Sequence, residues 1–311
     1  MKINIEGIRV LIRIFEDNKI GYDKLMELSK TKAMKAFIEH EKSFNKNISR
    51  KIIIEELIKL SRDNDYTDRY SLYMLKNNIS LVKKELLYIE EHNEKIIGEA
   101  LEKVYNFIPK SIKIQTNISL YAGGIDGGFT VNRRDIFINY LKYFSKPEEL
   151  IKVISHELFH CRFTPLNNKV KNIFIDNINN RYTYEIFGKI LEEGIACLIQ
   201  HGIALEEDDP AGTLTKAKMK IIDIKFERLN SFLLGIKEGN IDYSIIKRLD
   251  IYPLGYYIVS SLYKFNGIEL LIPWIENYNY KETIKSYIKV SRETGNCSGF
   301  TKEIEVWLLQ I

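Results

Sequence analysis

The sequence has 311 residues, of which 45% are apolar and 12% aromatic, enough for one large or two ordinary domains with a hydrophobic core. Its formal net charge of +4 comes from 46 basic and 42 acidic residues with no long basic block, so binding to nucleic acid or to a membrane is not expected. No stretch approaches the ~18 apolar residues of a membrane span, and no apolar signal segment is recognised. The 3 cysteines are too few for a disulfide framework, so we expect a cytoplasmic protein.

Apolar residues recur at steps of three and four before the first proline, Pro109, which is typical of amphipathic helices. This region, residues 1–108, is therefore predicted to be a packed helical subdomain. The predicted helices cover residues 3–17, 22–44, 49–63, 70–91 and 94–107.

After Pro109 the period changes to two, and alternating apolar residues predict a strand over residues 112–120. Glycines then surround Ile125 and Asp126 in a turn, and residues 129–131 and 135–139 are predicted to be returning strands. We expect a mostly helical α+β fold, in which residues 109–311 form a catalytic region with a small mixed or antiparallel sheet.

The segment from His156 to His160 contains two imidazoles four residues apart and a carboxylate, Glu157, directly after the first. On a helix the two histidines lie about 40° apart on one face, so both can bind the same metal ion. Glu157 is then placed to take a proton from a water that the metal activates. The alternative is a pair of core histidines without a metal.

Several signals predict that this segment is helical. Ser145 and Glu148 resemble a capping box, Pro147 lies in the first turn, and Pro165 follows the apolar run. Cys161 points about 100° away from His160 on such a helix and is predicted to be a packed thiol.

A catalytic zinc has three protein ligands and one open position, so a third ligand must come from another segment. Glu193 is the predicted third ligand of a single Zn²⁺ per chain, with Glu192 as the alternative if the register differs by one. Both lie in a second predicted helix, residues 182–200, in which Gly194 and the nearby Ala196 are predicted to allow a close approach to the histidine-bearing helix. His201, eight residues after Glu193, is expected to lie outside the ligand set.

The His-Glu-x-x-His segment followed by Glu193-Gly194-Ile195-Ala196 resembles the catalytic core of gluzincin metallopeptidases, the MA-clan branch that includes aminopeptidase N-like enzymes. The resemblance covers roughly residues 110–265 and implies a zinc peptidase with His156, His160 and Glu193 as ligands and Glu157 as general base. Thermolysin-like enzymes have an Asp four residues after the ligand Glu, where this chain has Cys197.

The same family has a transition-state tyrosine in a Tyr-x-x-Gly segment. The segment that begins with Tyr252 lies 59 residues after Glu193 and precedes a helix predicted over residues 256–263. The resemblance therefore implies Tyr252 as the oxyanion donor, with Tyr256 and Tyr257 as alternatives. Aminopeptidases of this branch also have a Glu that binds the substrate amine, and in the corresponding stretch this chain has Asp126.

The expected function is hydrolysis of a peptide or protein substrate, which would bind in an extended form along residues 127–131. One alternative is a catalytically silent, metal-containing protein that binds a protein partner. Another is a zinc amidohydrolase acting on a small amide. Helices predicted at residues 216–234, 268–277 and 302–311 are expected to wall the substrate cleft.

Overall fold

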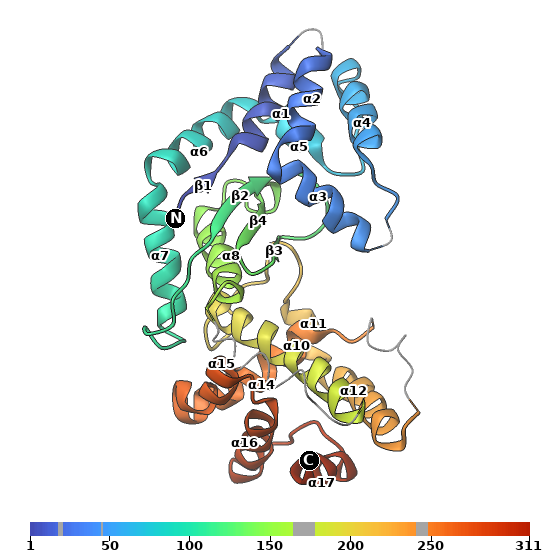
Figure 1. Cartoon of the computed structure of the whole chain (residues 1–311), viewed down its shortest axis with the longest axis vertical. Helices are drawn as coiled ribbons and strands as arrows, with labels where there is room; N and C mark the ends of the chain where they lie inside the picture. Colours follow the sequence, from blue (N-terminus) through green and yellow to red (C-terminus); the bar gives the residue numbers. More distant parts are fainter. Residues whose placement is uncertain (18–20, 45, 164–177, 241–247) are drawn as a thin grey trace. The chain divides into compact units, whose positions relative to one another are not determined.

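The computed structural model divides into two compact units (Figure 1). The first comprises residues 1–102 and 114–162, and the second comprises residues 103–113 and 163–311. The division that we predicted at residue 108 stays a prediction. None of the described helices is long and apolar enough to cross a membrane. The structure describes residues 1–17, 21–44, 46–163, 178–240 and 248–311, so Pro165 lies outside the described residues.

The first unit contains a small sheet surrounded by helices, which confirms the predicted α+β class. Its strands are β1 (Ile3–Asn4), β2 (Asn117–Tyr121), β3 (Gly128–Val131) and β4 (Asp135–Asn139). Its helices are α1 (Glu6–Glu16), α2 (Tyr22–Lys30), α3 (Lys32–Ser43), α4 (Arg50–Arg62), α5 (Leu72–Asn77), α6 (Ile79–Glu91), most of α7 (Asn93–Tyr105), the 3-10 turn η1 (Tyr140–Lys142) and α8 (Pro147–His160).

The strands follow the order β1-β2-β4-β3, with β1, β2 and β4 parallel and β3 antiparallel to β4. Side chains alternate between the two faces of this mixed sheet. Gly128 and Thr130 lie on the face that packs against α8, whereas Phe129 and Phe137 lie on the face that packs against α3. The antiparallel strand β3 is the last of the described sheet, so one of its edges is not paired with another described strand.

Local hydrogen bonds divide the helices that we predicted as continuous. The helix predicted over residues 22–44 is two helices, because Thr31 ends α2 and its hydroxyl accepts a hydrogen bond from the backbone N–H of Met34. The helix predicted over residues 70–91 is likewise divided at Asn78. Competition of such short polar side chains for backbone groups explains both breaks.

The first residues of two predicted elements also differ. Ile3 and Asn4 form a strand rather than the start of a helix, because they pair in parallel with β2. The strand predicted over residues 112–120 begins only at Asn117, and before it Ile114 makes an isolated bridge to Arg162. The alternating pattern of apolar residues thus begins before the first residue that pairs with a neighbouring strand.

The histidine-bearing helix α8 begins with Pro147, as predicted, but the expected capping box is wrong. Lys146 is the N-cap residue, and Ser145 has a positive φ of 58°. The Ser145 hydroxyl donates a hydrogen bond of 2.9 Å to Glu85 of α6 instead of capping the helix. The start of α8 is thus fixed by a contact with a residue 60 positions earlier.

The second unit is helical in the part that the structure describes. Helix α10 is longer at both ends than the helix predicted over residues 182–200, and the helix predicted over residues 256–263 begins five residues earlier as α14. The C-terminal helix α16 was not predicted. The helices are α10 (Ile178–His201), α11 (Lys216–Lys220), α12 (Ile222–Glu238), α14 (Ile251–Asn266), the 3-10 turn η2 (Gly267–Leu270), α15 (Ile272–Asn277), α16 (Tyr280–Glu293) and α17 (Lys302–Gln310).

Helices α10 and α14 are in backbone contact within this unit. A Cβ atom on Gly194 of α10 would lie 2.5 Å from the carbonyl carbon and oxygen of Gly255 in α14, so neither position has room for a side chain. We had expected Gly194 to allow an approach to the histidine-bearing helix, and the close neighbour that the structure gives it is Gly255. The contact brings the Glu193-Gly194 and Tyr252-x-x-Gly255 segments together.

We expect Gly194→Ala to lower the free energy of unfolding by about 2–3 kcal/mol, because the added methyl group overlaps backbone atoms that cannot rotate away. Gly98→Ala is the matched control: Gly98 lies inside α7, and no atom lies within 4 Å of the position that its methyl group would occupy, so it should raise stability by about 0.5–1 kcal/mol. Denaturant unfolding of both variants measures the difference. Equal stability of the two variants would contradict the close helix contact.

Candidate active site

Helix α8 carries His156, Glu157 and His160 in its last two turns. The two imidazole rings have their centroids 5.1 Å apart at an interplanar angle of 70°, and they offer ring nitrogens within 4.8 Å of each other. His156 is buried, with 6% of its surface exposed, whereas His160 is half-buried. Both imidazoles therefore lie on one side of the helix, as joint ligation of one ion requires.

Glu157 is buried, with 5% of its surface exposed. Its Oε2 accepts a hydrogen bond of 2.7 Å from the hydroxyl of Thr130 on β3. Its Oε1 lies 3.1 Å from the position that a Cβ atom on Gly128 would occupy. The carboxylate thus lies directly against the α8-facing side of β3. A buried carboxylate needs such a donor, because removing it from water without one is costly.

Cys161 is buried directly after α8, which confirms the predicted packed thiol. Its Sγ donates a hydrogen bond of 3.4 Å to the hydroxyl of Thr116. Burial raises the pKa of the Cys161 thiol, so little of the reactive thiolate is present at neutral pH.

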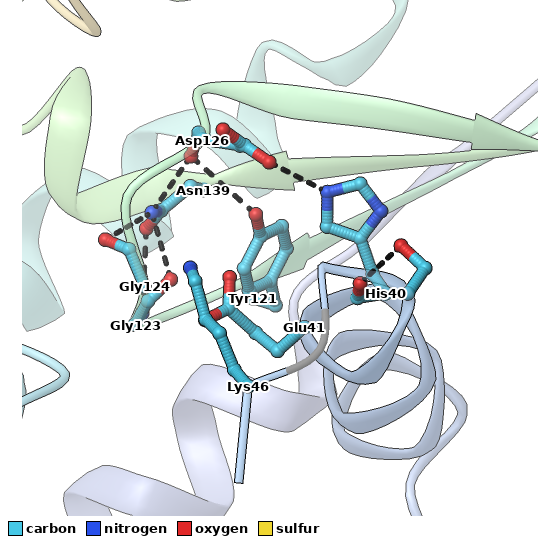
Figure 2. A network of polar contacts seen from close by, with 9 residues as sticks. His40, Glu41, Lys46, Tyr121, Gly123, Gly124, Asp126 and Asn139 are labelled. Carbon is cyan, nitrogen blue, oxygen red and sulfur yellow. Dashed lines mark hydrogen bonds and ion pairs between the residues drawn. The ribbon is translucent and has the colours of Figure 1, made fainter. Parts of the chain in front are cut away.

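The glycine-rich loop between β2 and β3 is held by the side chain of Asn139 (Figure 2). The Asn139 amide donates hydrogen bonds of 2.8 Å to the carbonyl of Gly123 and 3.0 Å to the carbonyl of Asp126, and its backbone N–H bonds the carbonyl of Gly127. Gly123 and Gly124 have φ values of 120° and 80°, as the turn predicted from the glycines requires. This loop therefore has a defined shape.

Asp126 in this loop is paired with a histidine of α3. The Asp126 Oδ2 lies 2.7 Å from His40 Nε2 (Figure 2). The His40 ring stacks on Phe129 of β3 with centroids 3.8 Å apart. Both partners are partly exposed, at 18% for His40 and 34% for Asp126. The carboxylate of Asp126 is thus engaged by an imidazole from another element.

Three residues in this unit were missed by the sequence analysis: His40, Thr130 and Asn139. His40 lies 86 residues from Asp126, and Thr130 lies 27 residues from Glu157, so no local spacing relates either pair. Thr130 does fall within a predicted strand, but an isolated hydroxyl in a strand gives no functional signal.

In the second unit, the two adjacent acidic residues of α10 differ in their surroundings. The Oε2 of Glu192 accepts a hydrogen bond of 3.1 Å from the indole N–H of Trp274 in α15. Glu193 is half-buried and lies one turn before the buried Cys197, whose thiol pKa is raised well above its ordinary value, first by burial and then by the charge of Glu193. The indole of Trp274 thus holds the carboxylate of Glu192, and Glu193 stays the predicted ligand. His201 is the last residue of α10.

The three candidate tyrosines are in or near the first turn of α14. The Tyr256 hydroxyl donates a hydrogen bond of 3.0 Å to the carbonyl of Gly202, and burial raises the pKa of Tyr256 to about 12. The Tyr257 ring packs edge-on against Phe226 of α12. Tyr252 is partly buried against the cluster of Cys197, Leu214 and Tyr256. Tyr252 stays the predicted oxyanion donor.

A family model described as "Putative zinc dependent peptidase (DUF5700)" matches residues 25–295 of the chain. This match spans most of the sequence, including all of the candidate site residues. No curated protein and no solved structure matches the sequence.

We expect alkylation with iodoacetamide at neutral pH to modify Cys297 and to leave Cys161 and Cys197 unmodified in the folded protein. Cys297 is exposed, whereas the other two thiols are buried and have raised pKa values. Mass spectrometry of tryptic peptides measures the modification, and alkylation after unfolding in denaturant is the control in which all three react. Rapid labelling of Cys161 in the native protein would show that its burial is wrong.

Proposed function

Because the chain belongs to the DUF5700 family, we propose that it is a gluzincin-type zinc metallopeptidase that hydrolyses peptide bonds with Glu157 as general base. The family description supports zinc-dependent peptidase chemistry as the class. The observation that carries the finer proposal is the arrangement on α8, where two imidazoles share a side of the helix and the carboxylate between them in sequence is buried against β3.

The proposed ligands of a single Zn²⁺ are His156, His160 and Glu193. The two histidines offer ring nitrogens within 4.8 Å of each other on α8, and Glu193 is the third donor proposed from the Glu-Gly-x-Ala segment of α10. Two imidazoles and one carboxylate are a donor set that zinc accepts in catalytic sites, in which a fourth position stays open. When bound, zinc supplies Lewis-acid chemistry that lowers the pKa of a water and polarises a carbonyl group.

The protein residues then have separate tasks in the proposed hydrolysis. Glu157 takes a proton from the attacking water and later delivers that proton to the leaving amine, so that one peptide bond and one water become a carboxylic acid and an amine. The phenol of Tyr252 donates a hydrogen bond to the oxygen on which negative charge develops.

The proposed substrate binds in an extended form along β3. The register of β3 supports this placement. The backbone N–H of Asn139 bonds the carbonyl of Gly127, so every second residue from Gly127 onward directs its backbone groups to β4. The backbone groups of the residues between them, Gly128 and Thr130, therefore point to the other edge of β3. A peptide paired there would lie next to the carboxylate of Glu157.

We expect Glu157→Gln to keep the zinc content of the parent and to abolish peptide hydrolysis, because the amide cannot accept the proton. His160→Ala and Glu193→Ala should lose zinc, because each removes one of three ligands. Metal analysis after dialysis and cleavage of a peptide library measure both properties.

The matched control is Glu148→Gln, which makes the same change at an exposed position in the first turn of α8 and should keep both activity and zinc. Cleavage by Glu157→Gln at the rate of the parent would show that another group is the base. Turnover of small amides but not of peptides would identify an amidohydrolase instead.

We expect Tyr252→Phe to reduce kcat by two to three orders of magnitude with little change in KM, because loss of one oxyanion donor costs about 3–4 kcal/mol in the transition state. Tyr256→Phe tests the neighbouring phenol: it should lower stability through the lost bond to Gly202 and leave kcat nearly unchanged. The reverse result, a large loss of kcat in Tyr256→Phe alone, would assign the oxyanion role to Tyr256.

A further inference from the structure

The side chain of Thr130 connects the edge strand to the carboxylate of Glu157. Thr130 and Gly128 are alternate residues of β3, so both face α8. Thr130 is half-buried, and its hydroxyl donates to Glu157 Oε2 at 2.7 Å. In the described part of the chain, Thr130 is the hydrogen-bond donor to this carboxylate.

The two oxygens of Glu157 therefore differ. Oε2 is fixed by the Thr130 hydroxyl, whereas Oε1 makes no hydrogen bond with the described residues and faces Gly128. A methyl group on residue 128 would lie 3.1 Å from Oε1 and 3.0 Å from the side chain of Ile138, tighter than ordinary packing allows. The absent side chain of Gly128 leaves room beside the oxygen that is not held by Thr130.

We propose that Thr130 is a positioning residue for the general base, an inference that rests on the proposed function. Its hydroxyl holds Oε2 and so fixes the rotation of the carboxylate, which leaves Oε1 to take the proton from the attacking water and to return it to the leaving amine. A buried carboxylate with a single fixed orientation needs no reorganisation when the proton moves.

Thr130 also relates the base to the substrate strand. Its backbone groups point to the edge of β3 that pairs with none of the described strands, where the peptide is proposed to pair, while its side chain holds Glu157. One residue thus sets both the register of the bound peptide and the orientation of the carboxylate.

The first experiment compares Thr130→Val with Thr130→Ser in the zinc-loaded full chain. Valine has nearly the shape of threonine without the hydroxyl, and we expect kcat to fall about 10–100-fold with KM and zinc content close to those of the parent. Serine keeps the hydroxyl and should restore kcat to within about threefold of the parent. Thr283→Val in the second unit is the control, because it removes a buried threonine hydroxyl that donates to the Asn279 carbonyl and should lower stability without lowering kcat.

The second experiment measures the contact without relying on activity. A double-mutant cycle of Thr130→Val and Glu157→Ala in denaturant unfolding should give non-additive effects, with a coupling of about tenfold or more in the unfolding equilibrium constant, as expected for a hydrogen bond to a charged group. Additive effects would overturn the proposal because the bond would be absent.

The outcomes separate the two proposals. If the parent cleaves peptides and Thr130→Val retains its kcat, or if Thr130→Ser fails to restore it, the positioning role is wrong and the peptidase function stands. If the zinc-loaded parent cleaves no peptide while the cycle shows coupling, the proposed function is wrong, and the Thr130 hydrogen bond is then structural.

Discussion

A carboxylate removed from water must keep a hydrogen-bond donor, and in the first unit this constraint ties α8 to the edge strand β3. Glu157 is almost fully buried and meets the constraint through Thr130. The contact depends on register, because a slip of one residue in β3 would place Phe129 against α8 and direct the hydroxyl to the other face. The register in which β3 pairs with β4 thus determines that a hydroxyl group, and not an aromatic ring, lies against Glu157.

The second unit depends on a different constraint, the close approach of two helices. Gly194 and Gly255 bring α10 and α14 into backbone contact. The candidate site residues of these two helices lie within one to three positions of the two glycines. Glu193 is adjacent to the contact on one helix, and Tyr252 lies one turn before it on the other. Cys197, one turn after Gly194, packs with Leu214 and Tyr256 in a buried cluster against which Tyr252 lies.

Features that depend on neighbours in sequence could be predicted. The spacing of apolar residues was sufficient to predict the fold class, the returning strands and the histidine-bearing helix. This spacing shows that one face of an element is buried, and it does not depend on which other element covers that face. The local spacing of His156 and His160 on a helix follows from the same geometry.

Features that depend on tertiary contacts could not be predicted. Ser145 has the sequence environment of a helix cap, and only the position of Glu85 in space explains why its hydroxyl does not cap α8. The hydrogen bond of Glu192 to the indole of Trp274 could not be predicted either, because the two residues are 82 positions apart and no local pattern relates them. The two-residue strand β1 is too short for any periodicity to reveal it.

The amide of Asn139 has a consequence for how this protein can vary. It bonds backbone carbonyls of the loop after β2, so the path of that loop is encoded by a residue of β4 rather than by the side chains at the loop tip. Ile125 at the tip is 60% exposed, and its replacement removes no backbone support. Residues at the tip can therefore be substituted, in evolution or by design, to bind other molecules, provided that Asn139 is retained.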